Sequence, residues 1–536
     1  MAYAFLARSG SLLKSATLAV ALLASAAPIA HAEGGETLVI ARSMDINALD
    51  PARAFCDTCQ IVLTALYDTM VGLAPDNKTI VPKLAASWEI NADQTVFTFK
   101  LDPKATFADG SKVEAKDVKW TFERLKNIKG SPSFFMDGVT SVETPDEATV
   151  VITLAASNSE FINKLSAGFT GIINSDVAAG AGATAAADAD KTDKAETWFL
   201  EHSAGGGPFT LISYRPDDEL RLARNDAYWG KKPEFAEAVF RQTQDAVAQA
   251  QLLQSGGADV AMQVDVDTAK SLTGSDVKTE IVQSYNFLYI ALGVGAKSNK
   301  VPLTPDVRRA IALAIDYEGM IDFTVGGAGK PQSSPIPNGF PGTEGLPERS
   351  RDLAEAKVLL EKAGVAEGFE IEAVYPNDNV YGVDINLMMQ KVQQDLAEVG
   401  INVTLTPATY PVWRDQINGV GIPMTAVYYA PDYYGSGQYV DYFGMMPGTA
   451  WAKRAGAESE PSVINPKETE LLKQALASGG AEQEKSFHAL GLEMMNDNII
   501  IPLVSPNMVL AYRSDLEGVR YSACCNLPLS EISRKK

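Results

Sequence analysis

The fold of this chain is decided by AASWEINADQTVFTFKLDPKATFADGSKVEAKDVKWTFERLKN, residues Ala85 to Asn127. Between Val96 and Leu101 the side chains alternate between two faces, with the larger apolar ones on one face. This alternation is the pattern of a half-buried β-strand. The pair Asp109-Gly110 predicts a tight turn, because glycine adopts backbone angles that other residues avoid. The stretch therefore starts with a strand that is followed by a turn.

A helix is predicted after this turn. Ser111 and Glu114 have the spacing of a capping box, in which two side chains satisfy free amides at a helix start. Apolar residues then recur at helical spacing at Ala115, Val118, Phe122 and Leu125. These patterns predict an α/β unit, and by themselves they indicate no function.

The same residues resemble a family signature. The matching positions are Trp88-Glu89, Asp93, Phe97-Thr98-Phe99, Phe107, Asp109-Gly110, Ala115 and Asp117-Val118. They resemble the usual sequence pattern of the peptide/nickel-type (family 5) solute-binding proteins of ABC importers. That pattern has Trp-Glu, a Tyr-Thr-Phe strand, a Phe-x-Asp-Gly turn and an Ala-x-Asp-Val helix start. The chain departs from that pattern at Asp102, Ala108 and Glu114, where arginine, histidine and threonine are common.

Other parts of the chain extend the resemblance. Leu49-Asp50-Pro51 precedes a predicted helix, and Asn225 to Gly230 reads NDAYWG, as in this family. The resemblance implies an α/β fold, namely a two-lobed periplasmic binding protein of the type II-like kind. Mixed sheets, a hinge of crossing strands and an extra subdomain in lobe I are then expected.

The resemblance also divides the chain into segments. We expect residues 33–292 to form lobe I, with the extra subdomain at roughly 75–205, and residues 293–498 to form lobe II. Residues 499–536 should complete lobe I, because they begin with an apolar strand that returns the chain there.

Within lobe II, the patterns themselves predict part of the topology. Residues 369–375 and 401–405 have the apolar character of strands, and residues 383–399 between them form an amphipathic helical pattern. A strand, a helix and a second strand in this order predict two parallel strands.

The first residues indicate export. Arg8 and Lys14 precede an apolar run from Ala16 to Ala27, and Ala30-His31-Ala32 fits a small-x-small cleavage site. We therefore expect residues 1–32 to be a signal peptide that is cleaved after Ala32. No cysteine lies at that position, so the expected product is a freely diffusing periplasmic protein.

The charge and the residue types limit the function. A net charge of −21 argues against nucleic-acid binding, since phosphate binding needs a positive surface. No serine-hydrolase elbow, zinc-protease motif or phosphate loop occurs in the sequence. We therefore predict a binding protein and no enzyme, with a secreted hydrolase as the rival class.

No cofactor or metal is expected either. Only His202 and His488 remain after processing, which disfavours nickel and haem. Four cysteines remain, and in an oxidising compartment disulfides are the first interpretation. The candidates are Cys56, Cys59, Cys524 and Cys525. The sequence does not rank their three possible pairings, and Cys56-x-x-Cys59 would also suit redox or metal chemistry.

The most informative candidate site lies at residues 426–443, AVYYAPDYYGSGQYVDYF. Tyrosines surround Asp432 and Asp441 there, and a carboxylate among aromatic rings can hold an ammonium group. In the peptide-binding branch of the family, an aspartate at this place binds the α-amino group of the ligand. Tyr429-Ala430-Pro431-Asp432 corresponds to that run, so the resemblance assigns the role to Asp432, although tyrosine replaces tryptophan.

Further ligand-binding candidates are Tyr428, Tyr429, Tyr433, Tyr375, Asn377, Trp413 and Trp451. Tyr375, Asn377 and Tyr381 follow a strand end, where open α/β sheets commonly place ligand contacts. The alternative for the tyrosines is that they pack in the core of a lobe. No arginine for a peptide carboxylate can be assigned from the sequence.

The resulting hypothesis is the periplasmic substrate-binding component of an ABC importer. It would capture a small solute between two lobes by hinge closure and deliver it to a membrane permease, as a monomer. A di- or oligopeptide is the leading solute. An opine, a sugar or another cationic metabolite on the same scaffold is the alternative.

Overall fold

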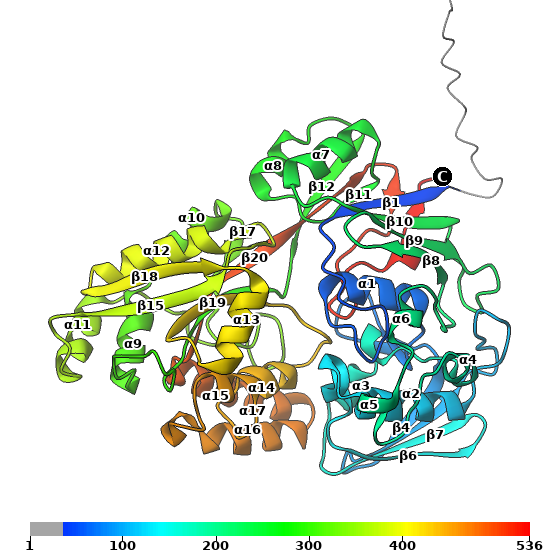
Figure 1. Ribbon diagram of the computed structural model, residues 1–536, viewed down its shortest axis with the longest axis horizontal. Helices are drawn as coiled ribbons and strands as arrows, with labels where there is room; N and C mark the ends of the chain where they lie inside the picture. Colours follow the sequence, from blue (N-terminus) through cyan, green and yellow to red (C-terminus); the bar gives the residue numbers. More distant parts are fainter. Residues whose placement is uncertain (1–35) are drawn as a thin grey trace, which may run out of the picture. The chain divides into compact units, whose positions relative to one another are not determined.

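One twelve-stranded mixed sheet extends through both lobes of the protein, in the computed structural model, which describes residues 36–536 (Figure 1). Its strands are, in spatial order, β18 (Ile401–Ala408), β15 (Phe369–Pro376), β19 (Met424–Tyr429), β13 (Phe287–Leu292), β20 (Ile500–Arg513), β11 (Val260–Ala261), β1 (Thr37–Arg42), β10 (Glu237–Gln242), β9 (Glu219–Arg224) and β8 (Phe209–Arg215). Two more strands, β12 (Val277–Gln283) and β14 (Gly329–Lys330), also pair with β20.

The crossing strand of this sheet is β20. Its first residues pair antiparallel with β13, and its later residues pair with β11 and β12. The apolar run that predicted a returning strand ended at Val504, whereas β20 continues to Arg513. A continuous strand therefore connects the sheet of lobe II with that of lobe I, as the hinge of crossing strands requires.

The stretch from Ala85 to Asn127 builds the extra subdomain. Its antiparallel sheet has the order β4 (Ala85–Ile90), β5 (Val96–Leu101), β7 (Thr149–Leu154) and β6 (Val139–Asp146). Phe97 and Phe99 are fully buried while Lys100 is exposed, which confirms the predicted alternation. The predicted helix is α2 (Ala115–Ile128), and its apolar face is buried.

The helix start differs from the prediction. The capping box is formed by Glu114 and Asp117. Ser111 instead donates its hydroxyl to Asp109, at 2.5 Å, within the preceding turn. A short polar side chain next to aspartate prefers this local bond, and the capping role passes to the next acidic pair.

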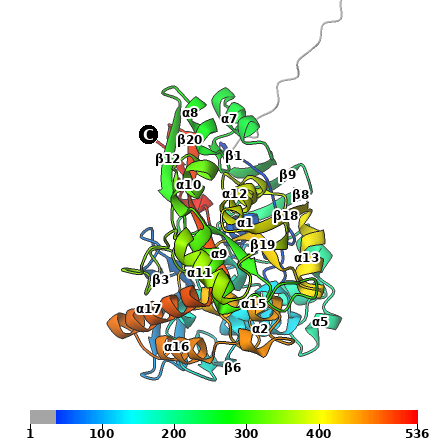
Figure 2. The ribbon, with the colours of Figure 1, turned by 90° about the vertical axis from the view of Figure 1, so that its left-hand side faces the viewer.

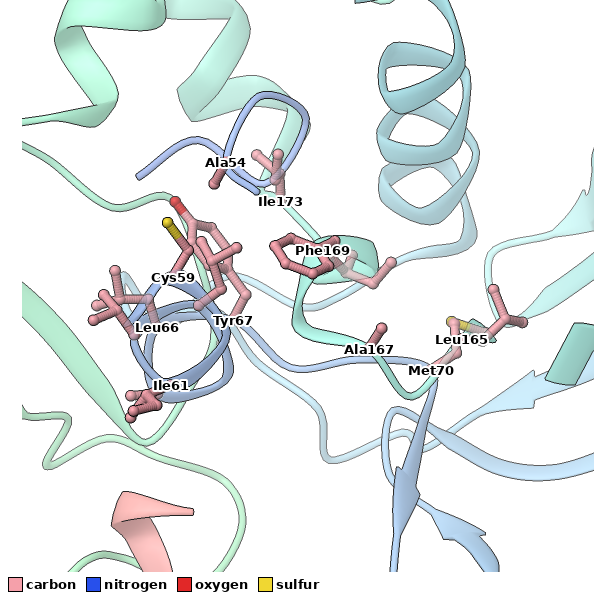
Figure 3. Close-up of a cluster of buried hydrophobic side chains, with 14 of the residues drawn as sticks. Ala54, Cys59, Ile61, Leu66, Tyr67, Met70, Leu165, Ala167, Phe169 and Ile173 are labelled. Atoms are coloured by element: carbon pink, nitrogen blue, oxygen red, sulfur yellow. The ribbon is translucent and has the colours of Figure 1, made fainter. Parts of the chain in front are cut away.

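The remaining elements of lobe I surround these sheets. They are α1 (Asp57–Leu66), β2 (Val71–Leu73), β3 (Ile80–Pro82), η1 (Ser131–Met136), α3 (Phe161–Lys164), η2 (Gly168–Thr170), α4 (Ser175–Gly180), α5 (Ala189–Thr192), α6 (Glu196–Phe199), α7 (Ala246–Ser255) and α8 (Val266–Ser271). Figure 3 shows part of the buried cluster around α1: Cys59, Leu66 and Tyr67 lie together, Phe169 lies beyond Tyr67, and Leu165 lies beside Met70. The core thus holds α1 in a fixed position.

Lobe II contains the predicted parallel pair. Strands β15 and β18 pair in parallel, and α12 (Ile385–Ala397) connects them, which confirms that prediction. The other elements are α9 (Pro305–Ala314), α10 (Tyr317–Val325), α11 (Leu353–Lys362), β16 (Asn379–Val380), β17 (Val383–Asp384), α13 (Tyr410–Gly419), α14 (Gly437–Phe443), α15 (Ala450–Arg454), η3 (Pro461–Val463), α16 (Pro466–Leu476) and α17 (Gly480–Asp497). Helices α9 and α11 pack together, as do α16 and α17 (Figure 2). The chain ends with β21 (Leu516–Glu517), η4 (Leu529–Glu531) and β22 (Ser533–Arg534).

A buried ion network explains the Leu49-Asp50-Pro51 motif. Arg124 of α2 is fully buried, and its guanidinium donates to both oxygens of Asp50 at 2.7 and 2.6 Å. It also donates to Asp193, at 2.9 Å. These two carboxylates raise the pKa of Arg124 against the opposing effect of its burial. The network joins the motif loop to α2 and to the segment after α5.

No helix among residues 36–536 has the length and apolar character needed to cross a membrane. Within the same residues, no group of three or more His, Cys, Asp or Glu side chains is arranged to hold a metal ion. The expected signal peptide, with its cleavage after Ala32, lies outside the described residues.

Candidate functional site

Asp432 lies at the contact between the two lobes. It follows β19 by three residues, and its side chain is 4% exposed. Its Oδ1 accepts a hydrogen bond from Gln60 Nε2 of lobe I, at 3.3 Å, and its Oδ2 accepts one from the Tyr429 hydroxyl, at 3.5 Å. No lysine or arginine of the described residues pairs with it. Burial therefore raises the pKa of Asp432 to about 8, and the nearby carboxylate of Asp57 adds to this shift.

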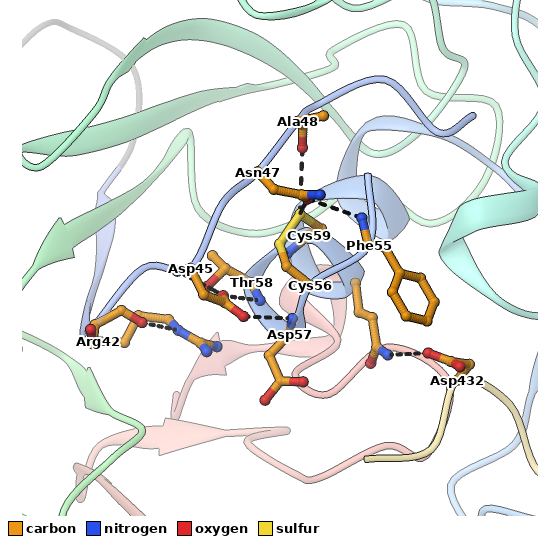
Figure 4. The surroundings of a disulfide bond; sticks show 12 residues. Arg42, Asp45, Asn47, Ala48, Phe55, Cys56, Asp57, Thr58, Cys59 and Asp432 are labelled. Atoms are coloured by element: carbon orange, nitrogen blue, oxygen red, sulfur yellow. Dashed lines mark hydrogen bonds between the residues drawn. A yellow bond between two sulfur atoms is a disulfide. The ribbon is translucent and has the colours of Figure 1, made fainter. Parts of the chain in front are cut away.

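Asp57 supplies that second carboxylate from lobe I. It is the first residue of α1, and its backbone amide donates to Asp45 Oδ2 at 2.9 Å. Its side chain points away from the helix, on the side where Asp432 lies (Figure 4). The hydroxyl of Tyr381, from lobe II, donates to Asp57 Oδ2. Burial, and then the neighbouring Asp45, raise the pKa of Asp57 to about 6.

The two carboxylates make the site electrostatically incomplete. Both carboxyl groups have a raised pKa, because surrounding protein replaces water and because the two like charges repel each other. Each also receives one hydrogen bond from the opposite lobe: Asp432 from Gln60, and Asp57 from Tyr381. A cationic group placed between the lobes would stabilise both carboxylates in their charged form.

Aromatic side chains line this part of the molecule. The rings of Tyr381 and Tyr428 meet edge to face, with centroids 5.7 Å apart. Tyr381, Tyr428 and Tyr429 are surrounded by protein, yet each keeps accessible surface. Tyr381 also has a φ of 54°, a strained conformation for a bulky residue that costs about 1–3 kcal/mol. Such strain is common where a side chain must be aimed at a ligand.

A disulfide fixes the turn that carries Asp57. Cys56 is the N-cap residue of α1 and is joined to Cys59, so the bond spans Asp57 and ends next to Gln60 (Figure 4). Cys59 is fully buried, which anchors this turn in the core of lobe I. Both polar groups that reach toward Asp432 therefore start from one rigid helical turn.

The structure differs from the expectation that all four cysteines are oxidised. Cys524 and Cys525 are thiols, with their Sγ atoms 2.8 Å apart. Neighbouring Cα atoms are about 3.8 Å apart across a trans peptide bond, whereas disulfides usually join Cα atoms about 4.4–6.8 Å apart. Adjacent cysteines therefore close a disulfide less readily than Cys56 and Cys59, whose Cα atoms are 5.0 Å apart.

The other predicted site residues divide into two groups. Tyr428 and Tyr429 lie beside Asp57 and Asp432, whereas Tyr433 is fully buried and packs against Phe135 of lobe I, with ring centroids 6.0 Å apart. The hydroxyl of Tyr433 has no hydrogen-bond partner among the described residues. Tyr433 thus fills the contact between the lobes.

The remaining candidates pack away from Asp432. Tyr375 is fully buried in lobe II, and its hydroxyl donates to Asn386 at 2.7 Å. Trp413 is 2% exposed and donates to the Thr425 hydroxyl, and Trp451 is 1% exposed in the same aromatic cluster. For Tyr375, Trp413 and Trp451 the structure favours the core alternative. Asn377 is exposed just after β15, with its backbone amide bonded to Ala408.

A second contact between the lobes is centred on Glu160. This side chain, 4% exposed, accepts hydrogen bonds from the backbone amides of Ser436 and Gly437, both at 2.8 Å. A Cβ atom at Gly437 would lie 2.6 Å from the Glu160 carboxylate, so glycine is required for this approach. Burial raises the pKa of Glu160 to about 7. Glu160 therefore stabilises the contact between the lobes only while its carboxylate is bound to the amides of Ser436 and Gly437.

Sequence reasoning named Tyr381 beside Tyr375 and Asn377, but it missed Asp57, Gln60 and Glu160. The spacing Cys56-x-x-Cys59 drew attention to the sulfur atoms, while the functional groups stand inside and just after this motif. The contact of Gln60 with Asp432 spans 372 positions along the chain. No local pattern reports such a distant contact.

One surface depression lies elsewhere in the protein. It has a volume of about 380 Å³ and is lined by Tyr228, Lys231, Gly518, Ser530 and Glu531. It is open to solvent and shallow, and it does not contain Asp432 or Asp57. The interlobe residues therefore remain the better candidate site, because they combine unpaired charge with aromatic surface.

The sequence matches a known family over most of its length. Residues 79–450 match the model for bacterial extracellular solute-binding proteins, family 5 (middle). The probable D,D-dipeptide-binding periplasmic protein DdpA of Escherichia coli K12 is 27% identical over 512 residues, which cover 94% of this chain and 95% of that protein.

Solved structures share the fold. A periplasmic binding protein from Helicobacter pylori, DppA, in complex with the peptide STSA, aligns with a TM-score of 0.78 at 21% identity, covering 94% of this chain and 98% of that one. The binding protein AgaA from A. tumefaciens, in complex with agropinic acid, aligns with a TM-score of 0.77 at 23% identity, covering 93% and 99%. The two lobes, the crossing strands and the family match agree: this chain belongs to the bacterial extracellular solute-binding proteins of family 5.

Proposed function

We propose that this protein is the periplasmic solute-binding component of an ABC importer and that its ligand is a di- or oligopeptide. The observation that carries the proposal is the buried carboxylate of Asp432, which lies between the lobes and pairs with no lysine or arginine in the described part of the chain. The α-ammonium of a peptide would supply the missing charge. The relative that binds D,D-dipeptides supports this ligand class.

Binding and closure are coupled through the same carboxylate. In an open protein Asp432 would be solvated, whereas closure buries it beside Gln60 of lobe I. Burying an unpaired charge is costly, so an empty protein resists closure. A ligand ammonium removes that cost in the closed state only, and this differential affinity shifts the population toward closure.

An opine, a sugar or another cationic metabolite is the second candidate ligand. Tyr429 stands where the peptide-binding branch has tryptophan, and the fold is shared with a protein that was solved with agropinic acid. A phenol-lined site would suit any small cation. The two candidates differ in whether the ligand contains a peptide bond.

Native mass spectrometry of the protein purified from the periplasm tests the proposal. We expect a bound di- or oligopeptide, and calorimetric titration of the stripped protein with that peptide should give one site per chain. A co-purified ligand without a peptide bond would select the second candidate. The peptides should be recovered intact, since this family binds its solutes. Cleaved products that depend on folded protein would contradict the proposal.

The proposal also covers the location and the assembly. Edman sequencing of the exported protein should begin at Glu33, the residue after the predicted cleavage site. We further propose that the exported protein is a monomer that docks on the membrane permease of its importer. Light scattering of the stripped and the ligand-bound protein should give the mass of one chain in both states.

A further inference from the structure

The environment of Asp57 carries a charge that the peptide α-ammonium cannot balance. Four charged groups influence this point: Asp432, Asp57, Asp45 and Arg42. Three are acidic and one is basic, so the site carries an excess of two negative charges when all three carboxyl groups are ionised. A single ammonium group bound at Asp432 leaves one of them uncompensated.

The neighbouring groups do not neutralise Asp57 directly. Asp45 is occupied by the start of α1, where it accepts from the amides of Asp57 and Thr58 at 2.9 Å each. Arg42 is 3% exposed, and its guanidinium donates to the Ser43 carbonyl at 3.2 Å and contacts Met262 Sδ at 3.7 Å. No ion pair joins Arg42 to Asp57 in the described part of the chain. Among residues 36–536, the Tyr381 hydroxyl is the only hydrogen-bond donor at the Asp57 carboxylate.

An independent feature points to an incomplete polar contact near Asp432. The side chain of Tyr439 is fully buried, and its hydroxyl has no hydrogen-bond partner among residues 36–536. Burial, and then the charges of Tyr521 and Asp432, raise the pKa of this hydroxyl. A buried hydroxyl without a partner costs about 1–3 kcal/mol, so native proteins rarely keep one unless a ligand or water completes it.

The walls of the Asp57 carboxylate are phenolic. Tyr381 and Tyr428 meet edge to face beside it, and Tyr521 of the C-terminal segment is near enough to be influenced by its charge. These rings come from three separate parts of the chain. A carboxylate enclosed by phenol rings binds a cation through ion pairing and through the negative faces of the rings.

We propose that Asp57, walled by Tyr381 and Tyr428, forms a second cation subsite beside Asp432, so that the ligand carries two positive groups. The inference rests on the proposed function and narrows it: the ligand is a short peptide with a basic side chain next to its α-ammonium. Asp432 holds the ammonium from lobe II, and Asp57 holds the basic side chain from lobe I. The two cations then balance the two excess negative charges of the closed site.

A pair of dipeptides tests this subsite. Lysyl-alanine and norleucyl-alanine have side chains of equal carbon length, and only the first has the second ammonium. Calorimetric titration of the stripped, full-length protein should give lysyl-alanine an affinity about 10- to 100-fold higher. In Asp57→Asn this ratio should fall to near one. In Asp432→Asn both affinities should fall, while the preference for lysyl-alanine remains.

Controls separate the possible outcomes. Asp322→Asn removes an exposed carboxylate from α10 and should leave the ratio as it is in the unaltered protein. Asp57→Glu keeps the charge and should retain part of the preference, which guards against a folding defect in Asp57→Asn. Equal affinities of the unaltered protein for both dipeptides would overturn the second subsite alone. Failure of both dipeptides to bind would overturn the peptide assignment and this inference together.

Discussion

Two groups of buried charge in this protein differ in one respect. In lobe I, Arg124 is fully buried and donates to Asp50 and Asp193 at 2.6 to 2.9 Å. Between the lobes, Asp432 and Asp57 receive their hydrogen bonds from neutral donors, and no lysine or arginine of residues 36–536 lies within hydrogen-bond distance of either carboxylate. The first group is electrostatically complete, and the second is not.

The difference teaches where to look for function in an acidic chain. Desolvated charges are costly, so a buried charge persists when other charges compensate it or when a ligand does so. The Arg124 network is compensated within the protein and belongs to its stability. We propose that the Asp432 and Asp57 pair is compensated by a ligand and serves binding. Mutations in the two groups should therefore have opposite signatures.

The largest effect is expected from breaking the complete group. Arg124→Met removes the fully buried cation between Asp50 and Asp193 and leaves Arg53, at 3.0 and 3.3 Å, as the remaining partner of both carboxylates. Removing one partner of a buried ion pair costs about 3–5 kcal/mol of the free energy of unfolding, and Arg53 should offset part of this cost. Urea denaturation of the stripped protein measures it. Ligand affinity of the folded fraction should change little.

The matched control is Arg309→Met on the surface of α9. Arg309 forms an exposed pair with Glu355 at 3.9 Å, and exposed pairs contribute about 0–1 kcal/mol. If both variants lose the same small amount of stability, the Arg124 network is not the structural group described here.

The second prediction breaks the incomplete group. Asp432→Asn keeps the shape but removes the charge that a ligand ammonium would meet. Loss of one partner of a buried charge pair costs about 2–5 kcal/mol, or roughly 30- to 4000-fold in affinity. The stripped variant should be at least as stable as the unaltered protein, since an unpaired buried carboxylate is removed. Calorimetry with the co-purified ligand, together with thermal melting, checks both statements.

Asp441→Asn is the control for Asp432→Asn. Asp441 lies on α14 in the same tyrosine-rich segment, yet its side chain is exposed. It forms no hydrogen bond with Gln60, the lobe I residue that contacts Asp432. We expect a much smaller loss of affinity. Unchanged affinity in Asp432→Asn would remove Asp432 from the site.

The third prediction uses pH to follow the same carboxylate. Closure raises the pKa of Asp432 from an ordinary value of 3.8 to about 8, chiefly by burial. The closed, ligand-free protein thus binds a proton that the unfolded chain has released. The stability that this bound proton contributes is fully present below the ordinary pKa of 3.8, and it is lost as the pH rises toward 8.

The thermal midpoint makes this shift measurable. The stripped Asp432→Asn variant should melt above the unaltered protein, by a margin that grows as the pH is raised from about 5 to 8. With ligand bound to the unaltered protein, the pH dependence due to Asp432 should disappear, because the ammonium holds it charged. A margin that stays constant over this range would contradict the pKa shift.

Local patterns predicted much of the fold. The alternation at Phe97 and Phe99 and the strand, helix, strand order of β15, α12 and β18 depend on residues near each other in sequence. The predicted capping box starts three positions too early, because Ser111 bonds to Asp109 in the turn and Glu114 becomes the N-cap residue. Turn chemistry competed there with helix capping, and both are local.

Part of the candidate site was proposed from the sequence: Asp432 from the family resemblance, and Tyr381 from its place after a predicted strand. The structure places Asp432 between the lobes, and its role in ligand binding stays a prediction. Asp57 and Glu160 were missed because their roles depend on contacts with lobe II, more than 270 positions away in sequence for Glu160. Tyr375 and Trp413 have aromatic side chains suited to a ligand, yet packing against their own lobe takes them into the core.

The fourth prediction concerns closure without ligand contact. Glu160→Gln places an amide group against the backbone amides of Ser436 and Gly437, so one of the two hydrogen bonds is lost. A hydrogen bond to a charged group contributes about 1.5–3 kcal/mol, so ligand affinity should fall at least tenfold. Small-angle scattering should show a more open protein at subsaturating ligand. Glu201→Gln, an exposed change in the same lobe, should do neither.

The smallest effect is expected from the disulfide at the start of α1. Cys56→Ser retains an N-cap side chain, which serine provides well, but opens the loop to Cys59. A loop of this length should stabilise the protein by about 2 kcal/mol or less. The same turn positions Asp57 and Gln60, so part of the loss should appear as weaker ligand binding rather than as lower stability.

A loss divided between ligand binding and stability would sharpen the comparison between the compensated charges around Arg124 and the uncompensated ones at Asp432 and Asp57. A cross-link in the core of a lobe acts on stability alone, whereas one that pre-orders a binding turn also lowers the entropy cost of binding. The affinity of Cys56→Ser for the ligand should therefore fall by about two- to fivefold, with dissociation becoming faster. Thiol titration of the unfolded, unreduced protein should count two thiols, from Cys524 and Cys525, before the change. It should count three thiols after the change, because Cys59 then has no partner. Full affinity in Cys56→Ser would mean that packing in the core of lobe I alone holds Asp57 and Gln60 in place.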